Sequence, residues 1–136
     1  MPPQAMGQQQ CGQDQAATVV TRANAYFARW YATPIHIPAM AAQLGIDLDQ
    51  LEASFERYRG RTAHEVLTQF RLQRLCEAIQ ADPSGWLTAQ AEACGFRTVH
   101  QANRAFLSNY CQTLAQFRQQ ARRARAWRAD QGQRAG

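Results

Sequence analysis

The chain of 136 residues contains no lysine, so all 15 of its basic side chains are arginines, and only 18% of its residues are charged. No apolar run approaches the roughly 18 residues of a membrane-spanning helix. The first 15 residues, MPPQAMGQQQCGQDQ, have neither the basic start nor the apolar core of a secretory signal. We therefore expect a cytoplasmic protein that makes no contact with a membrane.

Cysteine is sparse, and its spacing excludes the usual cysteine chemistry. The four cysteines, at positions 11, 76, 94 and 111, form no C-x-x-C pair, which argues against zinc or dithiol redox sites and favours a reduced protein. The three histidines lie far apart, without cysteine or carboxylate at metal-ligand spacing. No serine lies in a nucleophile-elbow context, and there is no glycine-rich phosphate loop. We expect no enzyme, no cofactor and no metal site.

Apolar residues recur at helical spacing, and no segment shows the alternation of a half-buried strand. The hydrophobic share of 46% is sufficient for a packed core. Residues 1–17, rich in Gln, Gly and Pro, are predicted to be disordered. Beyond them the pattern predicts an all-α chain of about seven helices, at roughly 18–32, 38–44, 48–58, 62–80, 88–93, 99–109 and from 114 onward.

Four of the predicted helices begin with a capping pair. In a capping box the first side chain accepts a hydrogen bond from the backbone three residues later, and the second side chain reaches back to the first backbone N–H. The predicted pairs are Asp47 with Gln50, Thr62 with Glu65, Thr98 with Gln101, and Thr113 with Gln116.

An internal repeat is the most informative feature of the sequence. Ala41 and Gly45 recur as Ala91 and Gly95, and each pair is followed by an apolar residue and a capped helix. A small alanine lets two crossed helices approach closely, while glycine supplies the backbone angles of the short turn between them. The pattern predicts two helix-turn-helix units joined by a long helix, and the alternative is a plain helical bundle with coincident turns.

The chain resembles the DNA-binding domain of the AraC/XylS family of bacterial transcription regulators, over roughly residues 24–118. The stretches that carry the resemblance are YATPIHIPAMAAQLGIDLDQLEASFERYRG (residues 31–60), Phe70-Arg71-Leu72, Ala91-Glu92-Ala93-Cys94-Gly95-Phe96, Arg104-Ala105-Phe106 and Phe117-Arg118. The resemblance implies homeodomain-like units at residues 18–61 and 83–119, a linker helix at 62–82 and an arginine-rich tail at 120–136. It also implies an activator of the short stand-alone type, which binds double-stranded DNA as a monomer in the nucleoid and contacts RNA polymerase.

The sequence departs from the family pattern at several positions. Gln90 stands where an apolar residue is usual, and Ala102 replaces a larger apolar anchor. Cys111 and Leu114 stand where glycine and proline are expected, so we expect a looser or repacked second core. In the first recognition helix the positions that usually face bases are Asp49, Glu52 and Ala53, and a basic residue is common at the last of these.

The net charge of +5 lies entirely in the last 19 residues, since residues 1–117 contain nine arginines and nine acidic residues. Such a tail suits a polyanion, although a solvated helix end has the same composition. The expected phosphate contacts are Arg57, Arg59, Arg61, Arg97, Arg118, Arg122, Arg123 and Arg125. For Arg57, Arg59 and Arg61, local pairing with Glu56 or Glu65 is the alternative.

The second recognition helix has the side chains that read bases. Arginine bonds bidentately to guanine, glutamine or asparagine to adenine, and an apolar side chain packs on the thymine methyl group. By resemblance, the expected base contacts are Val99, His100, Gln101, Asn103 and Arg104. The first recognition helix, with its carboxylates, is expected to be a poor or highly selective reader of bases. We therefore predict a sequence-specific DNA-binding transcription regulator in which the second unit dominates. The rival is a diverged module that binds a partner regulator or RNA polymerase with little specific DNA binding.

Overall fold

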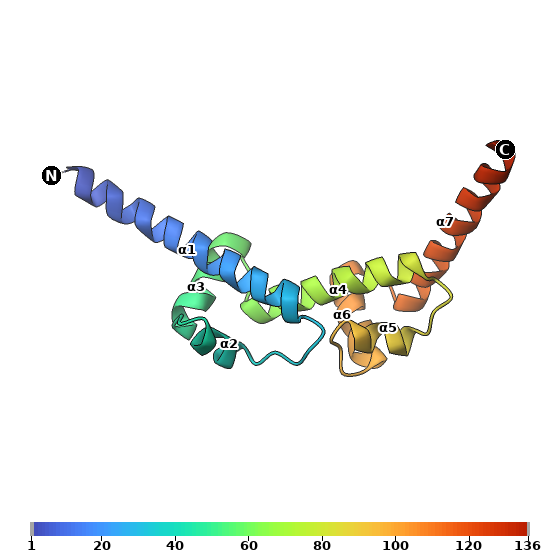
Figure 1. Cartoon of the computed structure of the whole chain (residues 1–136), viewed down its shortest axis with the longest axis horizontal. Helices are drawn as coiled ribbons and strands as arrows, with labels where there is room; N and C mark the ends of the chain where they lie inside the picture. The colour runs from blue at the N-terminus through green and yellow to red at the C-terminus, as the bar shows by residue number, and fades with distance from the viewer. Residues whose placement is uncertain (1, 136) are drawn as a thin grey trace. The chain divides into compact units, whose positions relative to one another are not determined.

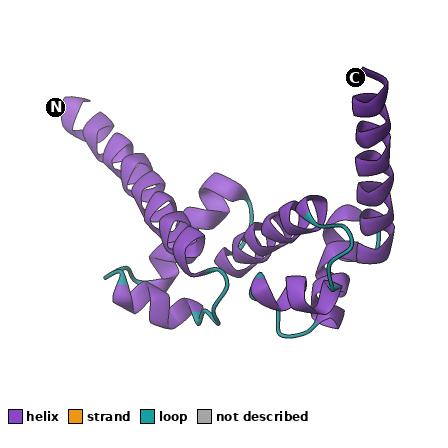
Figure 2. Cartoon of the chain, turned by 45° about the vertical axis from the view of Figure 1, so that its right-hand side comes forward, coloured by secondary structure: helices purple, strands orange, loops and turns teal. Residues whose placement is uncertain are grey.

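The computed structural model describes the backbone of residues 2–135 and the side chains of residues 15–132. Over this range the chain forms helices and loops and no strand, as Figure 2 shows, so the prediction of an all-α fold with seven helices is confirmed. The helices are α1 (Pro2–Trp30), α2 (Ile37–Gln43), α3 (Leu48–Arg59), α4 (Ala63–Ala81), α5 (Leu87–Ala93), α6 (Val99–Tyr110) and α7 (Leu114–Ala135) (Figure 1).

Helix α1 begins at Pro2, well before the predicted start near Thr18. Prolines are tolerated in a first helical turn, and the glutamines and alanines that follow are good helix formers. The helix predicted at roughly 18–32 therefore starts earlier in the structure than the apolar periodicity indicated. The side chains of residues 1–14 lie outside the described residues, and the predicted disorder of residues 1–17 stays a prediction for them.

The chain divides into two compact units, residues 1–70 and residues 71–136. In the first unit α1 packs across α3, and the rings of Phe27 and Phe55 stack with their centroids 6.1 Å apart. Both phenylalanines are fully buried, together with Leu51 and Leu67. Burying a side chain of this size stabilises the fold by about 1.5–3 kcal/mol. The apolar residues of α1, Val19, Val20, Ala23 and Phe27, therefore form the face that closes this core.

The core of the second unit is centred on Phe106 of α6. Its ring lies 4.8 Å from that of Tyr110 and 5.4 Å from that of Phe117 on α7. Ala102 is fully buried and Leu114 nearly so, so the unusual residues at these two positions do pack into the core.

Gln90 also has a structural role. Its Nε2 donates to the carbonyl of Asp82 at 2.9 Å and to that of Ala78 at 3.4 Å, which ties α5 to the end of α4. Its Oε1 is buried and accepts no hydrogen bond from the described residues. The polar residue that replaces the usual apolar one thus adds hydrogen bonds to two carbonyls at and just beyond the C-terminus of α4.

The two predicted turns have the same geometry. Gly45 and Gly95 adopt positive φ values of 69° and 96°, in the region that favours glycine. The residue that follows each glycine donates its N–H to the repeated alanine: Ile46 to the carbonyl of Ala41 at 2.9 Å, and Phe96 to that of Ala91 at 3.1 Å. The repeat found in the sequence is therefore a repeat of the helix-turn-helix structure.

Two of the four predicted capping boxes form as expected. Thr62 Oγ1 accepts from the N–H of Glu65 at 3.1 Å, and Glu65 Oε1 accepts from the N–H of Thr62 at 3.2 Å. The pair of Thr113 and Gln116 forms the same two bonds at 3.1 and 2.8 Å.

The other two pairs differ from the prediction. Thr98 accepts from the N–H of Gln101 at 3.0 Å, but Gln101 Oε1 reaches one residue further back and accepts from the N–H of Arg97 at 2.9 Å. Asp47 occupies the position before α3 without a side-chain capping bond, so the capping box predicted with Gln50 is wrong. Its backbone has the extended conformation usual before a helix, with φ of −64° and ψ of 138°, but its carboxylate accepts no hydrogen bond from the helix amides.

Candidate nucleic-acid interface

Helix α6 is the second helix of the second helix-turn-helix unit, and the structure divides its predicted base-reading residues into two groups. His100, Gln101 and Arg104 are exposed, whereas Val99 and Asn103 are half-buried. Val99 packs against the core of the unit. The predicted set therefore does not form one exposed surface.

Two of the predicted readers already use their amide oxygens within the protein. Gln101 accepts from the Arg97 amide, as described above, and Asn103 Oδ1 accepts from the N–H of Leu114 at 3.0 Å. A bidentate contact to adenine needs both the oxygen and the nitrogen of the amide group. These oxygens are consequently not available to a base in this geometry.

His100 and Arg104 are the remaining members of the set. They lie four residues apart, which places them on the same face of α6. Among the described residues neither side chain forms a hydrogen bond or an ion pair, and both are exposed. A guanidinium in this position retains its full set of donors for a guanine edge or a phosphate.

Helix α3 offers a different surface at the matching positions. Asp49 and Ala53 are exposed, whereas Glu52 is half-buried and its Oε2 accepts from the N–H of Ala63 at 3.2 Å. Asp47 and Glu56 are also exposed and add negative charge. Carboxylates on the docking face repel phosphates, so this helix is electrostatically unfavourable as the main DNA contact.

Arg57, Arg59 and Arg61 are exposed at the end of α3. Within the described part of the chain no ion pair joins them to Glu56 or Glu65. The carboxylate of Glu65 instead accepts from the Thr62 amide, which lowers the pKa of Glu65, and the charge of Arg61 lowers it further. The three guanidinium groups are therefore free for external partners, as is that of the exposed Arg97.

The arginines of α7 are not equivalent to one another. Arg122 Nε donates to the carbonyl of Pro83 at 3.2 Å, and Arg125 Nη1 donates to that of Ala81 at 2.9 Å. Ala81 is the last residue of α4, so these cations lie at the negative end of the α4 dipole and satisfy carbonyls there. Sequence reasoning missed this role because the partners are 39 and 44 residues away.

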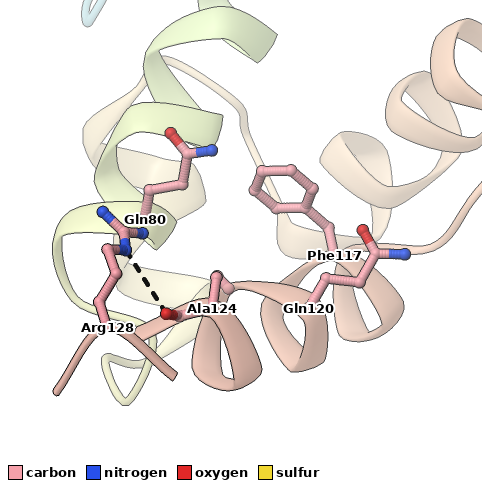
Figure 3. A pocket seen from close by; sticks show the side chains of 6 residues that line it. Gln80, Phe117, Gln120, Ala124 and Arg128 are labelled. Carbon is pink, nitrogen blue, oxygen red and sulfur yellow. Dashed lines mark hydrogen bonds between the residues drawn. The ribbon is translucent and has the colours of Figure 1, made fainter. Parts of the chain in front are cut away.

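Two other α7 arginines from the predicted phosphate set remain. Arg123 is exposed and makes no hydrogen bond or ion pair among the described residues, and Arg118 is half-buried. Arg128, which the sequence did not single out, donates from Nε to the carbonyl of Ala124 at 3.4 Å (Figure 3). It borders a groove of about 180 Å³ whose other lining residues are Gln80, Phe117, Gln120, Ala121 and Ala124.

The described residues contain no group of three or more His, Cys, Asp or Glu side chains that is arranged to hold a metal ion. Burial raises the pKa of the Cys76 thiol to about 11, and burial also raises the pKa of Cys94. Both side chains are consequently protonated near neutral pH and pack as small core residues. Among the described helices none is both long and apolar enough to span a membrane.

Comparison with known proteins places this geometry in a class. A family model described as a helix-turn-helix domain matches residues 40–120. The C-terminal domain of AraT, a response regulator from Geobacillus stearothermophilus, is similar with a TM-score of 0.69 and 20% identity, over 75% of this chain and 84% of that one. A protein of unknown function from Listeria innocua has a TM-score of 0.66 and 16% identity, over 74% and 94%. No curated protein matches the chain.

The match begins within α2 and ends in the first turns of α7, so it includes both glycine turns, α3, α4, α5 and α6. The protein thus carries a helix-turn-helix domain of the kind found in DNA-binding regulators, a class that is not enzymatic. More narrowly, the chain belongs to the AraC-type helix-turn-helix family, as the sequence predicted.

Proposed function

We propose that the protein is a sequence-specific DNA-binding transcription regulator whose second unit makes the dominant contact. The observation that supports this most directly is the outward face of α6, where the exposed side chains of His100 and Arg104 lie on the second helix of a helix-turn-helix unit. Such a helix enters the major groove, and arginine bonded to the O6 and N7 atoms of guanine is the commonest specific contact there.

The distribution of charge supports the unequal division of work between the units. Arg97, Arg104 and Arg123 are exposed in the second unit. The docking face of α3 in the first unit carries Asp49 and Glu56. Neutralised phosphates supply most of the non-specific affinity for DNA, so an acidic face lowers affinity while a basic one raises it.

The compartment, the oligomeric state on DNA and the mode of regulation are proposed from the resemblance to the AraC family. The protein acts in the bacterial cytoplasm on double-stranded DNA, binds its operator as a monomer, and activates transcription by contacting RNA polymerase. Arg57, Arg59 and Arg61 contact phosphates near the first unit, where their side chains are exposed. These contacts position the protein on DNA and do not read sequence.

The test begins with selection of bound fragments from genomic DNA, followed by titration of the best site and of a scrambled duplex at two salt concentrations. Arg104→Ala is expected to weaken specific binding by about 1–3 kcal/mol and to relax the preference at one base pair. Arg123→Ala is the matched control on α7. It should weaken both duplexes alike and reduce the slope of log K against log salt by about one.

A different result would favour the protein-interaction module. If the wild-type protein binds the selected and scrambled duplexes equally at low salt, the regulator proposal fails. Recovery of a stable complex with a regulator or with RNA polymerase in the same preparation would then support the rival function.

A further inference from the structure

The middle of each recognition helix holds the start of the following helix by one hydrogen bond. Glu52 Oε2 of α3 accepts from the N–H of Ala63 at 3.2 Å, and Asn103 Oδ1 of α6 accepts from the N–H of Leu114 at 3.0 Å. Each bond spans 11 residues, and both partners recur 51 residues later in the chain. The contact is therefore a duplicated feature of the two units.

The capping boxes explain why this acceptor is needed. At the start of α4 the Thr62–Glu65 box satisfies the amides of Thr62 and Glu65, and the Thr113–Gln116 box does the same at the start of α7. The first four amides of a helix have no partner within it, so two are left over at the start of each helix. One of the two belongs to an exposed residue, His64 or Ala115, and the other to a buried one, Ala63 or Leu114. The side chains of Glu52 and Asn103 accept from the buried residue's amide.

Water does not readily replace these acceptors. Ala63 is fully buried and Leu114 is 2% exposed. A buried N–H that loses its partner costs about 1–3 kcal/mol, considerably more than the net gain from a typical hydrogen bond. An acceptor at an N-terminus is also favoured by the helix dipole, especially when it is charged, as Glu52 is.

We propose that Glu52 and Asn103 are positioning residues, which fix the rotation of each recognition helix against the helix that follows it. Rotation of α6 by a few tens of degrees would pull Asn103 away from Leu114, and it would also turn His100 and Arg104 away from the groove. Asn103 therefore acts on base recognition through these two side chains and reads no base itself. This part of the inference rests on the proposed DNA-binding function, whereas the capping role does not.

The substitution Asn103→Asp separates positioning from reading. Aspartate keeps an acceptor at the same place but lacks the amide donor that a bidentate contact to adenine requires. Asn103→Leu has a similar size and removes the acceptor. Asn109 provides the matched control, since it is an exposed asparagine on the same helix whose Nδ2 donates to the carbonyl of Ala105. Asn109→Asp adds the same charge at a site that does not cap α7.

Two readouts are measured on the full chain: hydrogen exchange at the Leu114 amide, and affinity for every single base-pair variant of the selected site. Asn103→Leu is expected to accelerate exchange at Leu114 roughly 5- to 150-fold. It should also lower affinity for all site variants and flatten the base preferences assigned to Arg104. Asn103→Asp should leave exchange at Leu114 and the pattern of base preferences as in the wild type, with a uniform loss of affinity no larger than that of Asn109→Asp.

The proposal is overturned if Asn103→Asp abolishes the preference at one base pair while exchange at Leu114 stays unchanged, since Asn103 would then be a base reader. It is also overturned if Asn103→Leu leaves exchange at Leu114 unchanged. Glu52→Gln and Glu52→Leu, measured at the Ala63 amide, repeat the exchange test in the first unit. If the wild-type protein binds no specific DNA, the regulator proposal fails, and the exchange data still decide the capping role.

Discussion

The two units share one construction and differ in the surface they present. At a constant spacing of 51 residues, each has a buried phenylalanine, a left-handed residue after the recognition helix, a threonine capping box and a side chain that caps the next helix. The outward positions differ: Asp49 and Ala53 in α3 correspond to His100 and Arg104 in α6. The internal contacts are thus duplicated, while the outward surfaces of α3 and α6 differ.

The largest expected effects would test whether the two cores are independent. Phe55→Ala and Phe106→Ala should each reduce stability by about 3–5 kcal/mol, because both rings are completely buried. Hydrogen exchange followed by mass spectrometry should show the loss of protection within the unit that contains the substitution. Equal loss of protection in both units after either substitution would mean that they unfold as one.

Replacing the outward residues of α3 with those of α6 would test whether the different surfaces account for different DNA binding by the two units. The double substitution Asp49→His and Ala53→Arg gives α3 the surface of α6 and removes a carboxylate from the docking face. We expect tighter binding to DNA by about 1–3 kcal/mol, the range for a well-formed arginine–base contact, with a steeper salt dependence. Fluorescence polarisation with the selected duplex measures both. Unchanged affinity and salt slope would show that α3 does not approach DNA.

The left-handed residues at the ends of α3 and α6 give a smaller effect of opposite sign in the two units. Gly60 has φ of 64° and open space where a β-carbon would lie, and Cys111 has φ of 57°. Since this conformation costs a residue other than glycine about 1–2 kcal/mol, Gly60→Ala should destabilise the first unit by that amount. Cys111→Gly should stabilise the second unit by about 1 kcal/mol. Denaturant unfolding measures both changes, and loss of stability in Cys111→Gly would contradict the expectation.

The smallest expected effect separates two neighbouring arginines of α7. Arg122→Gln removes the bond to the carbonyl of Pro83 and should lower stability by about 0.5–1.5 kcal/mol. Arg123→Gln should leave the melting temperature unchanged and reduce the salt dependence of DNA binding. Thermal unfolding and salt titration of both variants distinguish the roles. Identical behaviour of the two variants in both measurements would show that the bond to Pro83 contributes nothing.

The sequence predicted what depends on neighbouring residues. Helical periodicity gave the number of helices, and the repeated alanine and glycine gave both turns, because these signals depend on residues within one or two helical turns of each other. It did not reveal that Asn103 uses its amide oxygen internally, nor that Arg122 and Arg125 donate to carbonyls at and just beyond the C-terminus of α4. Most of these contacts join residues of different helices, and nothing in the local sequence marks an exposed arginine as the partner of a distant carbonyl.

Each hydrophobic core is built from one continuous half of the chain, since the buried residues of the first cluster lie between positions 19 and 67 and those of the second between 72 and 121. The first cluster is therefore complete as soon as its own residues have left the ribosome, at about 5–20 residues per second. Helical units with such local contacts fold in microseconds to milliseconds, far faster than synthesis adds the second half. The first unit consequently reaches its native packing before the second exists, which limits mispairing between two halves of such similar construction.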